Sequence, residues 1–316
     1  MTVPHVPILR PEQLPVSLGT PLDGRSKTVV SDLINPYGFV VFRGYGVCSD
    51  QEFHDFIECF GLPNFTYAES FSNAVRRNRT PRVFTANEAP PEIEIFLHHE
   101  MAQTLVFPGQ LFFFCEQAPT KGGATPIGRS DLALAALEKA RPDFVAQLRS
   151  LGVRYRNAMP DSADLASGQG RSWKDTLNAV DRKQAEQRLT ELGYNFRWLD
   201  DGGISVQTPP LLAVDGFGRG KDVFFNQIVA AAAGWTNDES DEEPRLCYGD
   251  YSRIGQDDLD AAITACYEHT VDLEWQTGDI ALLDNLKVMH GRRPFSGSRS
   301  ILASLCTPIS RPSLGS

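Results

Sequence analysis

A chain of 316 residues, 41% of them hydrophobic and 22% charged, has the composition of an ordinary globular protein and is long enough to bury a large core. Its formal net charge of −10 argues against a general affinity for nucleic acids or anionic membranes, because binding to phosphates depends mainly on clustered Lys and Arg. We therefore expect a small-molecule partner, and neither a nucleic acid nor a membrane.

The sequence carries few signals of where in the cell the protein is located. The first residues lack a basic segment followed by an apolar run, and no stretch approaches the length of a membrane span, so a cytoplasmic location is the default expectation. The six cysteines are widely spaced and form no Cys-x-x-Cys pair, which argues against a zinc ribbon or a dense disulfide framework. Buried free thiols are expected instead.

The N-terminal part of the chain predicts two helices and one strand. A short helix is expected over residues 26–33, stopped by Asn35-Pro36, and the apolar run 39–42 predicts a buried strand. Ser49 and Glu52 form a capping box at the start of a second helix, with an apolar face of Phe53, Phe56, Ile57 and Phe60. The polar residues 64–82 predict a solvated loop, with a mobile lid over a site as the alternative.

The segment that ends at Glu100 carries the first chemical signal. Residues 93–97 alternate apolar side chains with a period of two, which is typical of a strand with one buried face. Residues two apart on a strand point the same way, so His98 and Glu100 are predicted to share a face and His99 to point to the other. A bare His-x-Glu pair is more often a surface histidine beside a solvated acid, so its context has to decide.

Cap and turn residues indicate where the predicted elements in the middle of the chain begin and end. Residues 105–115 predict a turn and a central strand whose aromatic side chains belong to the core. Ser130 is expected to cap one helix, and Pro142 to begin another that ends near residue 152. Residues 159–193 are the most polar part of the chain, with a helical pattern over 175–192. We expect them to be an insertion that covers the site, within a single domain spanning residues 1–316.

The following segments are mostly strands. Residues 195–199 and 204–208 predict a hairpin, and residues 223–228 predict a further strand. A loop is expected over residues 230–235 and the acidic run 239–243. The last predicted elements before the final apolar segments are a helix over residues 257–267 and a strand over residues 271–275.

His290 can complete a metal site with His98 and Glu100. It ends a return strand that follows an apolar strand from residue 278 and a turn at Asp284-Asn285. Two histidines and one carboxylate leave three open positions on a metal, which suits non-haem Fe(II) enzymes that activate O2. The same ligands with a water also describe a catalytic zinc, so a zinc hydrolase is an alternative. A metal-free jelly-roll binding module is another.

Two further motifs accompany these ligands: Gly122-Gly123-Ala124-Thr125-Pro126-Ile127, and the segment from Arg292 to Arg299. Together with the histidine segments they resemble the taurine dioxygenase (TauD/TfdA) family of Fe(II)- and 2-oxoglutarate-dependent oxygenases, over residues 38–305. The closest likeness is to its SyrP-like and clavaminate-synthase-like branch. This resemblance implies that His98, Glu100 and His290 bind iron, and that Thr125 and Arg299 bind the distal carboxylate of 2-oxoglutarate.

The resemblance also implies the reaction. Fe(II), 2-oxoglutarate and O2 would hydroxylate an unactivated C–H bond of an amino acid, free or carrier-tethered, or of a related natural-product intermediate, with desaturation as the alternative. Asn226, in a Phe-Asn-Gln element common in that branch, could face the substrate or simply bond to backbone. Sulfonate-cleaving members carry a second arginine where this chain has Ala303, which argues against a taurine-like substrate. Glu100 stands where family halogenases have a small residue, so halogenation is not expected.

The expected fold is mainly β with flanking helices around a double-stranded β-helix (jelly roll) core, because the chain has many short strands and its helices are gathered at the start and in insertions. In that architecture two strands far apart in sequence can meet at one open end. The long interval between His98 and His290 is then expected. Thr125 and Arg299 favour the oxygenase over the zinc hydrolase, since a hydrolase has no reason to carry a separate clamp for a dicarboxylate.

Overall fold

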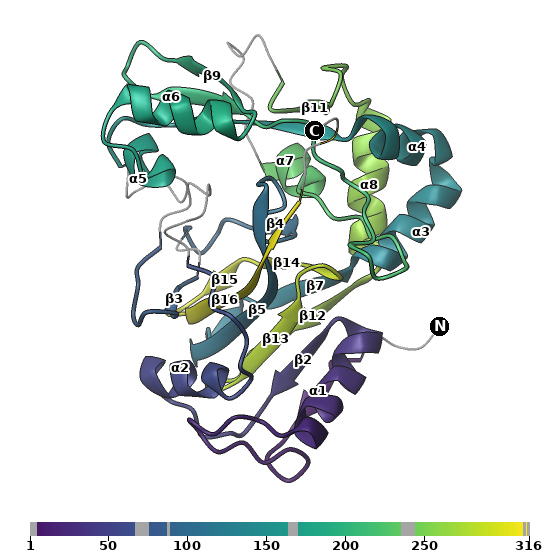
Figure 1. Cartoon of the computed structure of the whole chain (residues 1–316). Coiled ribbons are helices and arrows are strands. Elements are labelled where there is room, and N and C mark those ends of the chain that lie inside the picture. The colour runs from purple at the N-terminus through teal and green to yellow at the C-terminus, as the bar shows by residue number, and fades with distance from the viewer. Residues whose placement is uncertain are drawn as a thin grey trace.

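The computed structural model describes residues 5–66, 76–86, 89–163, 170–234, 244–311 and 314. Two β-sheets lie face to face in the middle of the molecule, with helices on their outer sides and a smaller layer at one end (Figure 1). The predicted fold, a mainly β jelly roll with flanking helices, is confirmed. Within the described residues the larger sheet runs in the order β1 (Ile8–Leu9), β2 (Phe39–Phe42), β13 (Ile280–Asp284), β5 (Val106–Gln117), β16 (Ser300–Ser310) and β3 (Phe84–Thr85). The sheet that faces it, called the smaller sheet below, runs in the order β12 (Thr270–Leu273), β7 (Thr125–Arg129), β14 (Val288–Arg292) and β4 (Ile95–His98).

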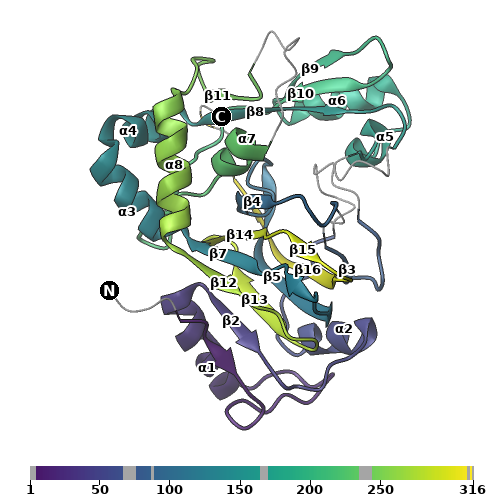
Figure 2. The ribbon, with the colours of Figure 1, turned by 180° about the vertical axis from the view of Figure 1, so that it is seen from behind.

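The larger sheet is buried on both faces, which explains its continuous apolar strands. In β2, Phe39 and Val41 join the core between the two sheets, while Val40 and Phe42 join the core beneath the N-terminal helices. Those helices are α1 (Gly24–Tyr37) and α2 (Asp50–Glu58), and both lie on the outer face of this sheet (Figure 2). The predicted strand over residues 39–42 is confirmed.

The N-terminal helices differ in how well their ends were predicted. The capping box is confirmed, because the Ser49 hydroxyl accepts from the Glu52 amide at 3.2 Å and the Glu52 carboxylate accepts from the Cys48 amide at 2.9 Å. The first helix is longer than expected and runs through Pro36 to Tyr37. It ends at Gly38, whose φ of 82° suits glycine and whose amide donates to the Ile34 carbonyl. A proline in the last turn removes a single amide donor and does not stop the helix.

Among the described residues, the helices that cover the outer face of the smaller sheet are α3 (Ser130–Ala140), α4 (Pro142–Leu151), α7 (Ile228–Gly234) and α8 (Gln256–Glu268) (Figure 2). The predicted helices over residues 142–152 and 257–267 are confirmed within one residue at each end. Ser130 does not cap α3, because its hydroxyl donates to the Lys287 carbonyl instead.

The prediction for residues 223–234 was wrong. Val223 forms only an isolated bridge with Asp215, and the residues expected to form a loop after it are the helix α7. Tertiary contacts explain the difference: Phe224 is buried in the core under the helices, and Phe225 in the core between the sheets. In sequence, an apolar run that is buried on two sides looks like a central strand. In the described structure, residues 223–228 pair with a neighbouring segment only through the Val223 bridge.

The polar segment after residue 159 contributes to a separate layer, seen at the top of Figure 1. Its sheet pairs β11 (Leu246–Tyr248), β8 (Val153–Met159), β10 (Ile204–Gln207) and β9 (Asn195–Trp198), so the predicted hairpin is confirmed. The single helix expected over residues 175–192 was wrong. It is divided into α5 (Trp173–Leu177) and α6 (Arg182–Glu191), because Asn178 is left-handed at φ 47° and Asp181 caps the second helix. That this segment is an insertion in a single domain stays a prediction.

The remaining expectations concern thiols and membranes. The six cysteines form no disulfide, and five of them are buried thiols, whereas Cys48 is exposed. Each helix that the structure describes is too short or too polar to span a bilayer. The acidic run 239–243 lies outside the described residues.

Candidate active site

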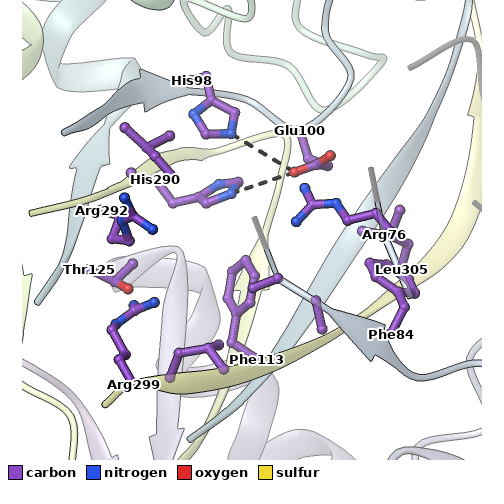
Figure 3. A pocket seen from close by; sticks show the side chains of 15 residues that line it. Arg76, Phe84, His98, Glu100, Phe113, Thr125, His290, Arg292, Arg299 and Leu305 are labelled. Atoms are coloured by element: carbon purple, nitrogen blue, oxygen red, sulfur yellow. Dashed lines mark ion pairs between the residues drawn. The ribbon is translucent and has the colours of Figure 1, made fainter. Parts of the chain in front are cut away.

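His98, Glu100 and His290 meet at one end of the smaller sheet. The strands β4 and β14 are antiparallel neighbours with His98 opposite His290, and the two imidazole centroids lie 4.4 Å apart. One Glu100 oxygen, Oε2, lies 3.9 Å from Nε2 of His98 and 3.6 Å from Nε2 of His290 (Figure 3). One potential ligand atom of each residue lies within 4.8 Å of the others. The three side chains could therefore hold one metal ion.

Glu100 reaches this position by a different route from the one predicted. The strand β4 ends at His98, and the chain turns so that Met101 adopts a φ of 59°. His98 and Glu100 therefore face the same side because the chain turns after His98, and not because both lie on one strand two residues apart. His99 does point the other way: it is fully buried, and its ring nitrogens contact the carbonyls of Asn285 and Phe224.

Asn285 joins the two ligand segments. Its side-chain amide donates to the Glu100 carbonyl at 3.0 Å and to the Pro108 carbonyl at 2.7 Å, and its Oδ1 accepts from the Glu100 amide at 2.8 Å. Both backbone polar groups of Glu100 are therefore held by one fully buried side chain. Asn285 lies in the connection from β13 to β14, which crosses from one sheet to the other. The sequence analysis noted this residue only as part of a turn.

The Phe-Asn-Gln element supports the turn from behind. Gln227 donates to the His99 carbonyl at 3.1 Å and to the Gln103 side chain at 2.6 Å. Asn226 is buried, donates to the Ala213 carbonyl and accepts from the Ile228 amide, and it does not line the pocket. These contacts match the backbone-bonding alternative considered for Asn226. Gln227, which the sequence analysis did not single out, contacts the ligand segment through its side chain.

Electrostatics keep His98 and Glu100 in the protonation states that bind a metal ion. Burial, with a contribution from His290, lowers the pKa of His98 to about 4, so its imidazole is neutral at physiological pH. Its Nδ1 contacts the Phe96 carbonyl at 2.8 Å, which assigns the proton to Nδ1 and the lone pair to the Nε2 atom that faces Glu100. Burial raises the pKa of Glu100, but the close approach of His290 and the charge of Arg76 outweigh it and hold that pKa at about 2.

A neutral imidazole and an ionised carboxylate are the forms that bind metal ions. The nitrogen and oxygen donors, two imidazoles and one carboxylate, suit a divalent transition metal such as iron or zinc and leave coordination positions open. The donor set therefore fits the iron implied by the sequence resemblance.

Thr125 and Arg299 lie together on the opposite side of the same pocket. Thr125 begins β7, and its hydroxyl accepts from Nε1 of Trp275 at 2.9 Å. Nε of Arg299 donates to the Gly123 carbonyl at 3.1 Å. Burial, with a contribution from Arg292, lowers the pKa of Arg299 to about 10, so the group is still a cation at neutral pH. A buried cation beside a hydroxyl is suited to a carboxylate guest.

The glycine pair before Thr125 has a steric reason. The short strands β6 (Lys121–Gly122) and β15 (Phe295–Ser296) pair here, and Gly122 has a φ of 71°. A Cβ atom at Gly122 would lie 2.4 Å from the Pro294 carbonyl oxygen, which is too close for any side chain. The close approach of these two short strands places Gly123 beside Arg299.

One pocket contains the three potential metal ligands, Thr125 and Arg299, with about 600 Å³ of empty space when its open mouth is counted. Phe113 of β5 also lines this pocket, with its ring centroid 5.2 Å from that of His290 (Figure 3). The prediction that the aromatic residues of this strand belong to the core holds for Phe107, Phe112 and Phe114, whereas Phe113 is partly buried and both packs against the core and lines the pocket. The rest of the wall is largely apolar: Phe84, Ala86, Ile95, Ile301, Ala303 and Leu305.

Comparison with known families agrees with this geometry. Residues 4–305 match the model of the family described as taurine catabolism dioxygenase TauD, TfdA family. The chain belongs to the TauD/TfdA family. As a member, it is a non-haem iron dioxygenase that depends on 2-oxoglutarate and acts on a small molecule.

Relatives of this TauD/TfdA chain include two proteins and a solved structure. A clavaminate synthase-like protein of Arabidopsis thaliana is 38% identical over 281 residues, covering 89% of this chain and 84% of the relative. The dapdiamide synthesis protein DdaC of Enterobacter agglomerans is 26% identical over 304 residues, covering 89% and 85%. The fold is also that of an asparagine oxygenase solved with Fe(II), 3-hydroxyasparagine and succinate, at a TM-score of 0.53, 14% identity, and coverage of 89% and 79%.

Proposed function

We propose that this oxygenase hydroxylates an unactivated C–H bond of an amino acid, free or carrier-tethered, or of a related natural-product intermediate. In this proposal His98, Glu100 and His290 bind the iron, while Arg299 and Thr125 bind the distal carboxylate of 2-oxoglutarate. The observation that carries it is the presence of both groups in one pocket (Figure 3). The proposal also treats residues 1–316 as a single oxygenase domain, and a cytoplasmic location stays a prediction.

The relatives support the substrate class. One is named for dapdiamide synthesis, and one structural neighbour is an asparagine oxygenase with a hydroxylated amino acid bound. Desaturation of the same kind of substrate is the runner-up, because it needs the same site and differs only after the first hydrogen is removed. A zinc hydrolase would leave the Arg299 and Thr125 pair without a purpose, and a metal-free binding module would leave His98, Glu100 and His290 without a shared one.

When bound, Fe(II) and 2-oxoglutarate supply the oxidising chemistry, in which O2 converts the cosubstrate to succinate and CO2 and oxidises the substrate. The residues of this chain supply the geometry. The neutral His98 and the ionised Glu100 occupy one side of the site and leave the other side open to guests. Arg299 and Thr125 fix the far end of the dicarboxylate, and the apolar wall around Phe113 limits access of water.

Two measurements test the proposal. Fe(II) added without oxygen should bind, and a visible absorption band should appear when 2-oxoglutarate chelates it. Succinate release should then be stimulated by members of a panel of free amino acids and their carrier-bound forms, with 18O2-labelled product distinguishing hydroxylation from desaturation. A protein that binds Fe(II) without this band, or whose product gains chlorine in chloride buffer, would contradict the roles given to Arg299 or Glu100.

A further inference from the structure

The turn that carries Glu100 has an unfavourable backbone conformation. Met101 follows Glu100 and has a φ of 59°, in the left-handed region that residues other than glycine rarely adopt. Such a conformation persists where contacts fix the backbone around it. Asn285 holds both the amide and the carbonyl of Glu100, which fixes the side before Met101. The backbone after Met101, which begins at Ala102, needs a partner as well.

Arg311, just beyond the end of β16, is that partner. Its guanidinium donates one hydrogen bond to the Ala102 carbonyl and another, of 3.0 Å, to the Leu212 carbonyl. Its backbone amide donates to the Leu105 carbonyl at 3.0 Å. Two of these three bonds end on the segment that follows Glu100. The C-terminal part of the chain is therefore attached to the turn that carries this potential metal ligand.

The guanidinium of Arg311 lies deep in the molecule. Only 7% of the residue is exposed, and the charged group lies 5.4 Å from the ring centroids of Phe107 and Phe225. The hydrogen bonds that its side chain makes within the described residues go to backbone carbonyls and not to a carboxylate. A buried charge without a carboxylate partner is costly, and an apolar side chain would fill the same space at lower cost. What Arg311 adds beyond packing is the fixed direction of two carbonyl groups, because its planar fork of donors is rigid.

Gln227 makes the corresponding contact on the other side of Glu100. Its side chain donates to the His99 carbonyl at 3.1 Å, whereas Arg311 holds the Ala102 carbonyl. Asn285 holds the backbone between these two points. The ligand segment is thus attached at three places by side chains from distant parts of the chain, and loss of Arg311 would release the end that follows the left-handed residue.

We propose that Arg311 is a positioning residue for the metal site: through the Ala102 carbonyl it holds the turn in the conformation that directs Glu100 toward the two histidines. Its guanidinium is outside the pocket lining and bonds to none of the three potential ligands, so it acts through the turn. This inference rests on the proposed function, in which Glu100 binds the iron. Loss of the guanidinium should then weaken Fe(II) binding and spare 2-oxoglutarate binding at Arg299.

The experiment uses three variants of the whole chain. Arg311→Met keeps much of the length and apolar surface of the side chain and removes its donors, whereas Arg311→Lys keeps the charge and can reach one carbonyl. The matched control is Arg154→Met on β8, outside the pocket lining. Arg154 also donates to two backbone carbonyls, those of Thr208 and Gly249, and its guanidinium lies 4.5 Å from the centroid of the Tyr251 ring.

Two dissociation constants are measured without oxygen. Fe(II) is titrated against a competing chromophoric chelator, and 2-oxoglutarate is titrated into the iron-loaded protein through its absorption band. Arg311→Met should weaken Fe(II) binding about 10-fold, the lower end of what residues that orient a metal ligand contribute, and Arg311→Lys about 3-fold, because it keeps one hydrogen bond. Arg154→Met should change Fe(II) binding by less than about 2-fold, and all three variants should keep the 2-oxoglutarate constant within about 2-fold.

Three results with folded Arg311→Met would overturn the inference. They are Fe(II) affinity within about 2-fold of the wild type, a loss no larger than that in Arg154→Met, and an equal loss of Fe(II) and 2-oxoglutarate affinity. If circular dichroism shows that Arg311→Met does not fold, Arg311→Lys decides: full Fe(II) affinity in that variant, or its failure to fold as well, would overturn the inference. A wild type that binds no Fe(II) contradicts the proposed function, whereas a wild type that binds it, together with any of these results, contradicts the role of Arg311 alone.

Discussion

The two ends of the pocket are built in different ways. At the metal end, His98, Glu100 and His290 come from two paired strands and a turn, and the backbone of that turn is held by the fully buried Asn285. At the arginine end, Arg299 makes one hydrogen bond to a carbonyl, and Thr125 accepts one from Trp275. The metal end is fixed by a network, and the arginine end depends mainly on charge.

This difference has a physical consequence. A metal ion needs all of its ligands at defined distances, so the chain fixes them before the ion arrives, and a lost ligand has no substitute. A dianion held by a guanidinium and a hydroxyl tolerates some movement, so each partner should contribute a separate and smaller share. The following predictions test this contrast, in order of decreasing expected effect.

The largest effect is expected at the metal end. His290→Ala should weaken Fe(II) binding by about 100-fold or more, because even residues that only orient a ligand typically contribute 10- to 100-fold. Metal content after gel filtration is the measurement. The control is His54→Ala on α2, whose ring contacts Thr80 and lies outside the pocket. The assignment of ligands would be wrong if His99→Ala abolished metal binding and His98→Ala did not.

Arg299→Ala should raise the dissociation constant of 2-oxoglutarate about 30-fold or more, since a charge-assisted pair in a partly buried pocket contributes about 2–5 kcal/mol. Arg299→Lys should recover part of the loss, because it keeps the charge and loses the fork of donors. Titration of the absorption band under anaerobic conditions measures both. The exposed Arg253→Ala is the control, and an unchanged constant in Arg299→Ala would exclude this residue as the anchor.

Asn285→Ala should lower the free energy of unfolding by about 2–3 kcal/mol, because it leaves buried backbone groups of Glu100 and Pro108 without hydrogen-bond partners. Fe(II) affinity should also fall about 10-fold, as the turn that carries Glu100 is released. Denaturant unfolding of the metal-free protein and metal titration separate the two effects. Asn195→Ala, at an exposed residue, should change the stability by less than about 0.5 kcal/mol.

The smallest effect is expected for Trp275→Phe. It keeps an aromatic ring and removes the Nε1 donor to the Thr125 hydroxyl, so 2-oxoglutarate should bind about 3-fold more weakly, in line with one hydrogen bond of about 0.5–1 kcal/mol. Fe(II) binding should stay unchanged. Trp198→Phe, which removes a similar donor to Glu186 far from the pocket, is the matched control. A loss of Fe(II) binding in Trp275→Phe would mean that the two ends are not independent.

Local signals predicted the regular elements well. The apolar run 39–42, the capping box at Ser49 and the helix that became Gln256–Glu268 depend on periodicity and caps within one segment. The error over residues 223–228 arises where contacts between distant segments outweigh local preference, because two cores enclose this apolar run. The error over residues 175–192 has a local cause: Asn178 adopts a left-handed conformation and Asp181 caps a second helix.

The sequence by itself determined the donor types of the candidate site, the glycine pair before Thr125 and the family resemblance, because these depend on residue identity and spacing along one strand or turn. Only the tertiary structure decided that Glu100 reaches His98 through a turn, that Asn285 bridges the two sheets, and that Phe113 and Arg76 face the same pocket. The physical reason is that the turn at Glu100 is held by Asn285, which lies 185 residues away along the chain, and that Arg76 and Phe113 belong to separate segments. Local periodicity carries no information about which distant strands will pair.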